Sequence, residues 1–269
     1  MSNILQKIIE TKKIELESRR ESHPIATLEK TMFFNRKTIS FKNSIIDPSK
    51  SGIIAEFKRQ SPSRGVINGN VLLEEVVKGY EKANASAVSI LTDKYYFGGD
   101  NIDVTEGRLL LNLPILRKDF IIDEYQIVEA KSIGADVILL IAAALEPSRL
   151  KQLAEFAKFL NLEVLMEVHN ENELITNLHD AIDVIGVNNR NLKDFSESIE
   201  TSIHLSGLIP SQYVKISESS ISKAETIVQL KEHGYKGFLI GETFMKQENP
   251  GEALAKLVAE VKELEKAHL

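Results

Sequence analysis

Residues 54–65 read Ile-Ala-Glu-Phe-Lys-Arg-Gln-Ser-Pro-Ser-Arg-Gly, a stretch in which an apolar strand ends in charged residues and a turn. Side chains alternate between the two faces of a strand, so Glu56 and Lys58 share one face while Ala55 and Phe57 take the other. The Ser-Pro-Ser-Arg-Gly segment ends the strand, and its small residues are typical of a loop that covers a substrate. Taken alone, the acid and the base have a second interpretation as a surface ion pair, which is common and weak.

The pattern of a short apolar run followed by a helical segment recurs along the rest of the chain. Runs of Val, Ile and Leu without polar alternation are typical of parallel strands that helices cover on both faces. Eight such units predict an α/β fold, a single (β/α)8 TIM barrel. A doubly wound open sheet is the alternative, although no glycine-rich dinucleotide loop follows the first run. The predicted strands are 52–57, 87–91, 114–117, 136–141, 163–168, 184–188, 213–217 and 237–240, and the predicted helices include 71–83, 124–133, 147–160, 223–233 and 251–266.

Residues 1–50 lie outside this repeat and predict an N-terminal helical extension packed on a barrel catalytic domain of residues 51–269. We expect its apolar stripe to pack on the barrel rather than on a membrane surface. A second helical piece over 26–31 is predicted to lead toward the first strand. The stripe consists of Ile4, Leu5, Ile8, Ile9 and Leu16, with Lys7, Lys12, Lys13, Arg19 and Arg20 predicted on the solvent side.

The composition is ordinary for a globular protein and excludes several classes of function. Hydrophobic residues make up 43% of the 269 residues, enough for a substantial core, and a net charge of −6 argues against a general nucleic-acid binder. The absence of cysteine excludes disulfides, thiolate metal sites and cysteine nucleophiles, and it fits a reducing cytosol. No stretch approaches the ~18 apolar residues of a membrane span, and residues 1–20 are too charged for a signal peptide. We therefore expect a soluble, cytoplasmic protein with no membrane or nucleic-acid partner.

Charged and amide side chains follow five of the predicted strands. The carboxyl ends of barrel strands carry the chemistry of this fold, so these side chains are expected to converge on one mouth. A charge between apolar strand residues is costly to desolvate unless it is paired, so Lys118 and Glu167 should pair or bind a ligand. Five converging ends favour a catalytic site. The strand-end residues are Glu56 and Lys58; Arg117, Lys118 and Asp119; Glu167; Asn188, Asn189 and Arg190; and Ser217 and Glu218.

Short turns of small residues follow the last two predicted strands. The chain reads Ser-Glu-Ser-Ser-Ile-Ser over 217–222 and Gly-Glu-Thr over 241–243. Loops at these two positions form the usual phosphate site of a barrel, where backbone N–H groups hold the anion. Alone the signal is weak, because small residues also make ordinary tight turns. Lys58, one strand away around a closed barrel, is placed to add a positive charge to the same phosphate.

Seven motifs follow one another in the order of the predicted strands, and with the N-terminal helical extension they resemble the indole-3-glycerol phosphate synthase family of tryptophan biosynthesis. The resemblance covers essentially the whole chain after Gly52. The motifs are Ile-Ala-Glu-Phe-Lys-Arg-Gln-Ser-Pro-Ser at 54–63, Ser-Ile-Leu-Thr-Asp at 89–93 with Tyr-Phe-Gly-Gly at 96–99, Leu-Arg-Lys-Asp-Phe at 116–120, Leu-Met-Glu-Val-His at 165–169, Ile-Gly-Val-Asn-Asn-Arg-Asn-Leu at 185–192, Ser-Glu-Ser at 217–219 and Leu-Ile-Gly-Glu at 239–242.

The resemblance implies a reaction that suits the strand-end residues. The family closes the pyrrole ring of 1-(2-carboxyphenylamino)-1-deoxyribulose 5-phosphate and, as a carboxy-lyase, releases carbon dioxide and water to give indole-3-glycerol phosphate. Ring closure needs a proton for the ketone oxygen, and Lys118 matches the family's general acid, while Glu167 matches the general base of the dehydration. Lys58 is implied to bind the substrate carboxylate or phosphate and is also a candidate for the second acid. Which lysine serves which step stays open.

The other matched positions are implied to bind the substrate, with no cofactor and no metal. A monomer or weak homodimer is expected, and contact with neighbouring pathway enzymes is left open. Residues implied to orient the lysines or hold hydroxyl and carboxylate groups are Glu56, Asn188, Arg190 and Glu218. Those implied to cradle the phosphate are Ser219, Ser220, Gly241 and Glu242. Those implied to form the slot for the anthranilate ring and the edge of the site are Ser61, Pro62, Phe97, Phe120, Leu139 and Leu192, with barrel core as the alternative for the two leucines.

Two positions depart from the commonest form of the family pattern. Ser220 stands where glycine is frequent, which would strain the turn if this position needs a positive φ. Glu242 stands where some members carry serine, and it places a carboxylate beside the proposed phosphate. We expect neither change to harm binding if the backbone N–H is the donor and the Glu242 side chain points to solvent.

Three rival functions use the same barrel. An isomerase of the same pathway relies on a cysteine, which this chain lacks. A Schiff-base aldolase would use Lys118 or Lys58 as the nucleophile. A silent phosphosugar-binding barrel would need the phosphate turns but would have no use for Lys118 opposite Glu167.

Overall fold

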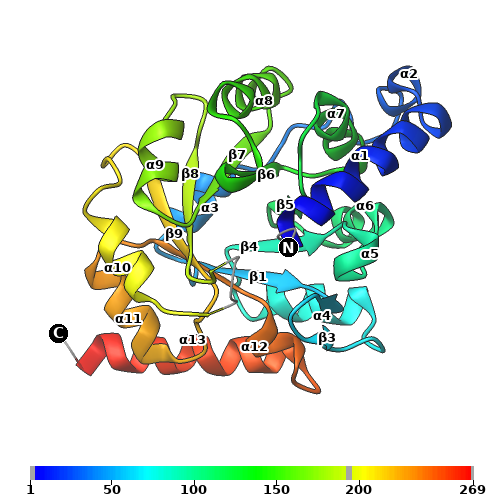
Figure 1. The fold of residues 1–269 in the computed structure, drawn as a ribbon. Coiled ribbons are helices and arrows are strands. Elements are labelled where there is room, and N and C mark those ends of the chain that lie inside the picture. The colour runs from blue at the N-terminus through cyan, green and yellow to red at the C-terminus, as the bar shows by residue number, and fades with distance from the viewer. Residues whose placement is uncertain (1–3, 192–195, 268–269) are drawn as a thin grey trace.

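The computed structural model describes residues 4–191 and 196–267, in which eight parallel strands close into a barrel ringed by helices (Figure 1). The order around the barrel is β1-β10-β9-β8-β7-β6-β5-β4, so sequence neighbours pair and β1 closes on β10. The predicted TIM barrel is confirmed, and the strand bounds fall within one residue of those expected. The strands are β1 (Ile53–Phe57), β4 (Ala87–Leu91), β5 (Ile115–Lys118), β6 (Val137–Ile141), β7 (Glu163–Val168), β8 (Val184–Asn188), β9 (Val214–Glu218) and β10 (Gly237–Ile240).

Alternate residues of each strand enter two separate apolar cores. Ile54 points into the barrel with Leu116 and Leu165, whereas Ala55 and Phe57 pack outward against the helices. The alternation expected for β1 therefore holds, and Glu56 points inward with Ile54. Because both faces are buried, most strand residues are apolar up to the charged carboxyl ends, with Glu163 at the start of β7 and Lys215 in β9 as exceptions.

The helices that follow the strands form the outer ring, with α13 running along α4 and α11 (Figure 1). Six of them, all of ten residues or fewer, were not predicted as helices from the sequence: α5, α6, α9, α10, α12 and η1. The outer helices are α4 (Leu73–Lys82), α6 (Asn101–Leu110), α7 (Glu124–Ile133), α8 (Pro147–Phe159), α9 (Glu171–Asn177), α10 (Glu200–Ser206), α11 (Ala224–Glu232) and α13 (Pro250–Ala267), and the short ones are α5 (Lys94–Phe97), η1 (Ala142–Ala144) and α12 (Glu242–Met245).

Three helices precede the first barrel strand: α1 (Ile4–Ser22), α2 (Ile25–Leu28) and α3 (Phe41–Ile46). The predicted piece at 26–31 corresponds to the shorter α2, and α3 was not predicted. Phe41 and Ile45 of α3 belong to the same apolar cluster as the inward residues of the barrel. Their neighbours bond to the beginnings of strands, since Ser40 Oγ donates to Glu163 at 2.6 Å. Helix α3 therefore closes the amino end of the barrel, opposite the site.

Helix α1 lies beside α7, with its first turns directed toward the barrel (Figure 1). The prediction that its charged side chains all lie on the solvent side is wrong for two of them. Lys12 is only 2% exposed and lies 2.9 Å from Asp93 and 3.0 Å from Asp119, and Arg19 lies 2.9 Å from Glu129. Burial opposes the charge of Lys12, but the two aspartates outweigh it and raise the lysine pKa. Both aspartates follow barrel strands, so α1 is anchored to the carboxyl end of the barrel.

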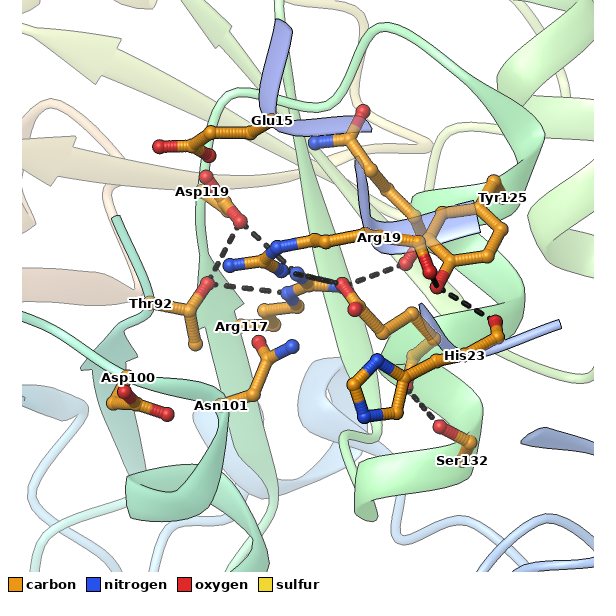
Figure 2. A network of polar contacts seen from close by, with 12 residues as sticks. Glu15, Arg19, His23, Thr92, Asp100, Asn101, Arg117, Asp119, Tyr125 and Ser132 are labelled. Carbon is orange, nitrogen blue, oxygen red and sulfur yellow. Dashed lines mark hydrogen bonds and ion pairs between the residues drawn. The ribbon is translucent and has the colours of Figure 1, made fainter. Parts of the chain in front are cut away.

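Arg117 of β5 continues this network between the strand and α7. Figure 2 shows its guanidinium between Thr92 and Asp119, at 3.1 and 3.0 Å. It also reaches Glu129 at 2.5 Å, and Glu129 pairs with Arg19 of α1. Arg117 is fully buried. It was grouped with the residues of the mouth, but the alternation along β5 turns it outward, so its role is to tie strand, outer helix and extension together.

Among the described helices, none has the length and apolar character needed to cross a membrane.

Candidate active site

A pocket at the carboxyl end of the barrel contains most of the predicted site residues. Side chains from β1, β5, β7, β8 and β9 form its polar floor, and loops form its walls. Of the predicted residues, it is lined by Glu56, Lys58, Ser61, Pro62, Phe97, Lys118, Phe120, Leu139, Glu167, Asn188, Arg190, Glu218 and Ser219. Leu192 lies outside the described residues.

Lys118 lies between two carboxylates at the centre of the pocket. Its Nζ is 3.1 Å from Glu167 Oε2 and 2.5 Å from Glu218 Oε2. Asn188 Nδ2 donates to the other oxygen of Glu167 at 3.1 Å. Strands β5, β7, β8 and β9 thus bring one ammonium group into contact with two carboxyl groups. Lys118 and Glu167 are paired, as one of the two expectations for them required.

The charges of this cluster shift one another's pKa values. Burial opposes the charge of Lys118, but Glu218 and Glu167 outweigh it and raise the lysine pKa. Burial likewise opposes ionisation of Glu167, but Lys118 and His169 outweigh it and lower the pKa of Glu167. Glu218 differs, because burial and the nearby Glu167 exceed the attraction of Lys118 and raise its pKa to about 7. At neutral pH, Lys118 is therefore an ammonium and Glu167 a carboxylate.

Glu56 and Lys58 form the predicted same-face pair, with Lys58 Nζ 2.7 Å from Glu56 Oε1. Glu56 is 4% exposed, so this is an inner pair of the mouth and not a surface ion pair. Two glycines make room for the acids of the floor. A Cβ on Gly241 would lie 2.6 Å from Glu56 Oε1, and a Cβ on Gly186 would lie 2.2 Å from Glu218 Oε1. Neither position accepts a larger residue without displacing a carboxylate.

An apolar wall faces the polar floor. The rings of Phe97 and Phe120 lie 5.9 Å apart between centroids, and Pro62 borders the same pocket. Leu139 belongs to the barrel core and lines the pocket as well, so its place in the core does not remove it from the pocket wall. Helix α1 contributes further apolar residues that the sequence placed only in a packing stripe: Ile4, Leu5 and Ile8.

The predicted phosphate turns lie around a second, adjoining cavity. Ser219, Ser220, Gly241 and Glu242 all border it, together with Lys58. Ser219 and Ser220 have φ angles of 65° and 61°, so both serines hold left-handed backbone that favours glycine. The strain foreseen for Ser220 is therefore present.

The Glu242 side chain departs from the expectation that it points to solvent. Its carboxylate lies 3.2 Å from Arg64 Nε and 3.7 Å from Arg190 Nη2. Arg190 also donates to Ser63 Oγ at 2.6 Å. Glu242 therefore joins two arginines at the edge of the phosphate cavity. The loop after β1 contains a small hairpin of β2 (Gln60–Ser61) and β3 (Gly65–Val66), and these contacts hold it over the mouth.

Two residues grouped with the mouth face away from it. Asn189 Nδ2 donates to Ser217 Oγ at 2.9 Å, and Asn189 Oδ1 accepts from the Ser202 hydroxyl of α10 at 2.9 Å. Ser217 and Ser202 are in turn 2.7 Å apart. This buried trio attaches α10 to the barrel, so Asn189 and Ser217 have structural roles.

His169 was not singled out from the sequence, although it lies within the motif of β7. Its Nε2 is 3.4 Å from Glu167 Oε1, and its Nδ1 is 3.1 Å from Glu173 Oε2. Glu167 and His169 are two residues apart, as Glu56 and Lys58 are. The alternation of side chains that predicts the Glu56–Lys58 pair therefore also predicts that Glu167 and His169 share a face.

Known proteins match this sequence over nearly their whole length. The sequence matches the family described as "Indole-3-glycerol phosphate synthase" over residues 5–257. The chain belongs to the indole-3-glycerol phosphate synthase family. An indole-3-glycerol phosphate synthase of Bacteroides thetaiotaomicron is 47% identical over 254 residues, which cover 94% of this chain and 97% of the relative. One from Campylobacter fetus is 45% identical, covering 91% of this chain and 95% of the relative. The family resemblance stated from the motifs is confirmed.

More distant solved structures share the barrel of this indole-3-glycerol phosphate synthase family member. A mutant tryptophan synthase alpha-subunit from Pyrococcus furiosus superposes with a TM-score of 0.61 at 17% identity, covering 80% of this chain and 99% of that one. At this identity the likeness shows the fold alone.

Proposed function

We propose that the protein is an indole-3-glycerol phosphate synthase that acts on 1-(2-carboxyphenylamino)-1-deoxyribulose 5-phosphate. The reaction closes the pyrrole ring, loses the carboxylate as carbon dioxide and then loses water. The observation that carries the proposal is the position of Lys118 between Glu167 and Glu218, at 3.1 and 2.5 Å, on the floor of a pocket with an aromatic wall. An acid and a base in contact suit a reaction that first protonates a ketone and later removes a proton.

Lys118 supplies the proton in the first step. Attack of the aromatic ring carbon on the ketone places negative charge on the ketone oxygen, and the ammonium donates to it as the bond forms. The aromatic wall of Phe97 and Phe120 suits the anthranilate ring, whose burial also removes water from its carboxylate. Loss of that carboxylate as carbon dioxide returns the electron pair of the broken bond to the ring, which becomes aromatic again, and leaves a hydroxyl on the former ketone carbon.

Glu167 is the base of the dehydration, in which the hydroxyl leaves as water and a proton is removed to complete the indole. Its low pKa, caused by Lys118 and His169 against the effect of burial, keeps it ionised for this task. Lys58, 2.7 Å from Glu56, anchors the carboxylate or phosphate and is the second candidate acid. The assignment of the two lysines to the individual proton donations belongs to this proposal.

The phosphate binds in the cavity bordered by Ser219, Ser220, Gly241 and Glu242, beside Lys58. Gly241 directly precedes α12, and the first N–H groups of a helix have no partner within the helix. Arg64 and Arg190 stand at the edge of this cavity, where Glu242 holds them. The carboxylate of Glu242 is thereby neutralised beside the anion.

The test is turnover of the proposed substrate by purified protein, followed by indole fluorescence, with a chelator present and no nucleotide. Formation of indole-3-glycerol phosphate is expected, and no indole product from folded protein contradicts the proposal. Borohydride added during turnover separates the aldolase alternative. An acid–base lysine stays unlabelled, whereas a Schiff base traps covalent substrate on Lys118 or Lys58.

We further propose that the protein works in the cytoplasm as a monomer or weak homodimer, with the phosphosugar–anthranilate substrate as its partner. The absence of cysteine supports a reducing compartment. Sedimentation at micromolar concentration measures the oligomeric state.

A further inference from the structure

His169 lies between two carboxylates on the side of Glu167 that faces away from Lys118. Its Nε2 is 3.4 Å from Glu167 Oε1, and its Nδ1 is 3.1 Å from Glu173 Oε2. Glu173 is itself fixed, because it accepts from the His169 backbone N–H at 2.8 Å and from Asn170 Nδ2 at 2.6 Å. Glu173 therefore fixes the Nδ1 side of the imidazole by a hydrogen bond, and Nε2 lies at ion-pair distance from the proposed base of the dehydration, without a hydrogen bond to it.

The two oxygens of Glu167 have different partners. Oε2 contacts Lys118, while Oε1 contacts Asn188 and His169. Asn188 is neutral, so the contact with His169 is the charged contact of Glu167 that does not involve the catalytic lysine. Of the glutamates described on the floor, Glu56 has Lys58 and Glu218 has Lys118 at 2.5 Å. The third glutamate, Glu167, contacts the same Lys118 and in addition the His169 imidazole.

Proton donation by Lys118 changes this balance. When the ammonium gives its proton to the ketone oxygen, the nitrogen becomes a neutral amine and Glu167 loses the charge that faced Oε2. A buried carboxylate without a counter-charge takes up a proton readily. A protonated Glu167 is unable to act as the base in the later dehydration. A second cation is therefore needed near Glu167 between proton donation by Lys118 and the dehydration.

We propose that His169 is a positioning residue whose imidazolium keeps Glu167 ionised after Lys118 has donated its proton. The proposal rests on the proposed function, because it takes the two roles from that reaction. His169 is not among the residues that line the substrate pocket or the phosphate cavity, and it acts through Glu167. Glu173 has the complementary task of holding the imidazolium in place and in its charged form.

The charges around the imidazole agree with this role. Glu167 on β7 and Glu173 on α9 face it directly, and Arg190, beyond the end of β8, lines the same side pocket. Burial opposes the imidazolium, but the two carboxylates outweigh it and raise the pKa of His169 to about 10. The side chain is 11% exposed, and with this raised pKa it is charged at neutral pH.

The test is single-turnover kinetics of wild type and His169→Gln across pH 4–9, with ring closure and dehydration measured separately. Glutamine keeps a hydrogen-bond donor beside Glu167 and removes the charge. We expect the acidic limb of the dehydration rate to move up by about one pH unit, which slows dehydration about tenfold on that limb. The ring-closure rate and KM should stay within about twofold, because Lys118 and the phosphate turns are unchanged.

His179→Gln is the matched control. His179 also pairs with a glutamate, Glu155 at 3.3 Å, but at a place away from the mouth. It should leave both rate constants and both pH profiles as in wild type. An unshifted dehydration profile in folded His169→Gln overturns the proposal.

If His169→Gln does not fold, a measurement on the wild type still tests the proposal. The assigned imidazole ¹⁵N resonances of His169 should show the charged form at pH 8, and a neutral imidazole there overturns the proposal. A wild type that makes no indole product contradicts the proposed function instead. An active wild type with an unshifted variant contradicts the role of His169 alone.

Discussion

Ser219 and Ser220 show at the residue scale how one backbone conformation limits the choice of side chain. Both lie in the left-handed region, with φ angles of 65° and 61°, and both border the phosphate cavity. A residue with a Cβ pays roughly 1–2 kcal/mol for this conformation, and a β-branched residue is the least tolerated. The Ser220 hydroxyl donates to Glu197 at 3.2 Å on the surface, which offsets little of that strain.

We predict that Ser220→Gly keeps the KM for the phosphate-containing substrate within about twofold and changes the free energy of unfolding by about 1 kcal/mol or less. Ser220→Val should raise KM about tenfold or more, because the turn would have to change shape and its N–H groups would turn from the anion. Steady-state kinetics of both variants check this. Equal KM values for glycine and valine would mean that the turn does not hold the phosphate.

The strand-end residues were largely predictable from the sequence because two rules, the convergence of strand ends and the alternation of side chains along a strand, decide which of them meet. Convergence of the strand ends on one mouth brought Lys118 opposite Glu167, and the alternation rule paired Glu56 with Lys58. Applied fully, it also separates inward Lys118 from outward Arg117, and it brings His169 to Glu167. The direction of the Glu242 side chain was not predictable, because its arginine partners come from two other loops.

At the scale of elements, one buried lysine makes a large contribution to the attachment of helix α1, beside the Arg19–Glu129 pair and the apolar stripe. Lys12 contacts Asp93 and Asp119, which follow β4 and β5, and both aspartates are buried. Removing the lysine takes the cation from Asp93 and leaves Asp119 with Arg117 alone, and breaking a buried pair in this way costs about 3–5 kcal/mol.

We therefore predict that Lys12→Met lowers the free energy of unfolding by about 3–5 kcal/mol. Lys13→Met, on the exposed face of the same helix, should change it by about 0.5 kcal/mol or less. Urea unfolding of the two variants compares them directly. Similar stabilities would show that the Lys12 ion pairs do not hold α1 on the barrel.

The long elements were predictable and the short ones were not, for a physical reason. A strand of five buried residues or a helix such as α8 carries a full hydrophobic period. Helices α5 and α12 have four residues each, about one turn, so no period is visible. They are fixed by caps and neighbours, as when Asp93 accepts from the backbone N–H of Tyr96 at 2.8 Å. The burial of Lys12 likewise required partners from distant strands.

At the scale of the whole molecule, the paired charges of the mouth link stability to pH. The pKa of His169 is raised from 6.5 to about 10 in the folded protein, so its contribution is fully present below pH 6.5 and is lost as the pH rises through 10. Glu167 and Asp119 act in the opposite sense. Their pKa values are lowered on folding, so their contributions are present above the ordinary carboxyl range and are lost in acid.

We predict that the wild type loses on the order of a few kcal/mol of unfolding free energy between pH 6.5 and pH 10 through His169. His169→Gln should lack this part of the decline, so the difference between the two proteins should shrink as the pH rises. Denaturant unfolding at several pH values in this interval measures it. Parallel stability curves would contradict the charged state of the imidazole.

The central claim is that Lys118 is the acid of ring closure and Glu167 the base of the dehydration. Single-turnover kinetics of Lys118→Ala and Glu167→Gln test it most directly. General acid–base groups contribute about 10²–10⁴-fold. Lys118→Ala should slow ring closure by that factor, whereas Glu167→Gln should close the ring and slow dehydration, so that an intermediate accumulates. Lys78→Ala, at an exposed pair with Glu74, serves as the control and should behave as wild type. Equal loss of the ring-closure step in both site variants would contradict the account.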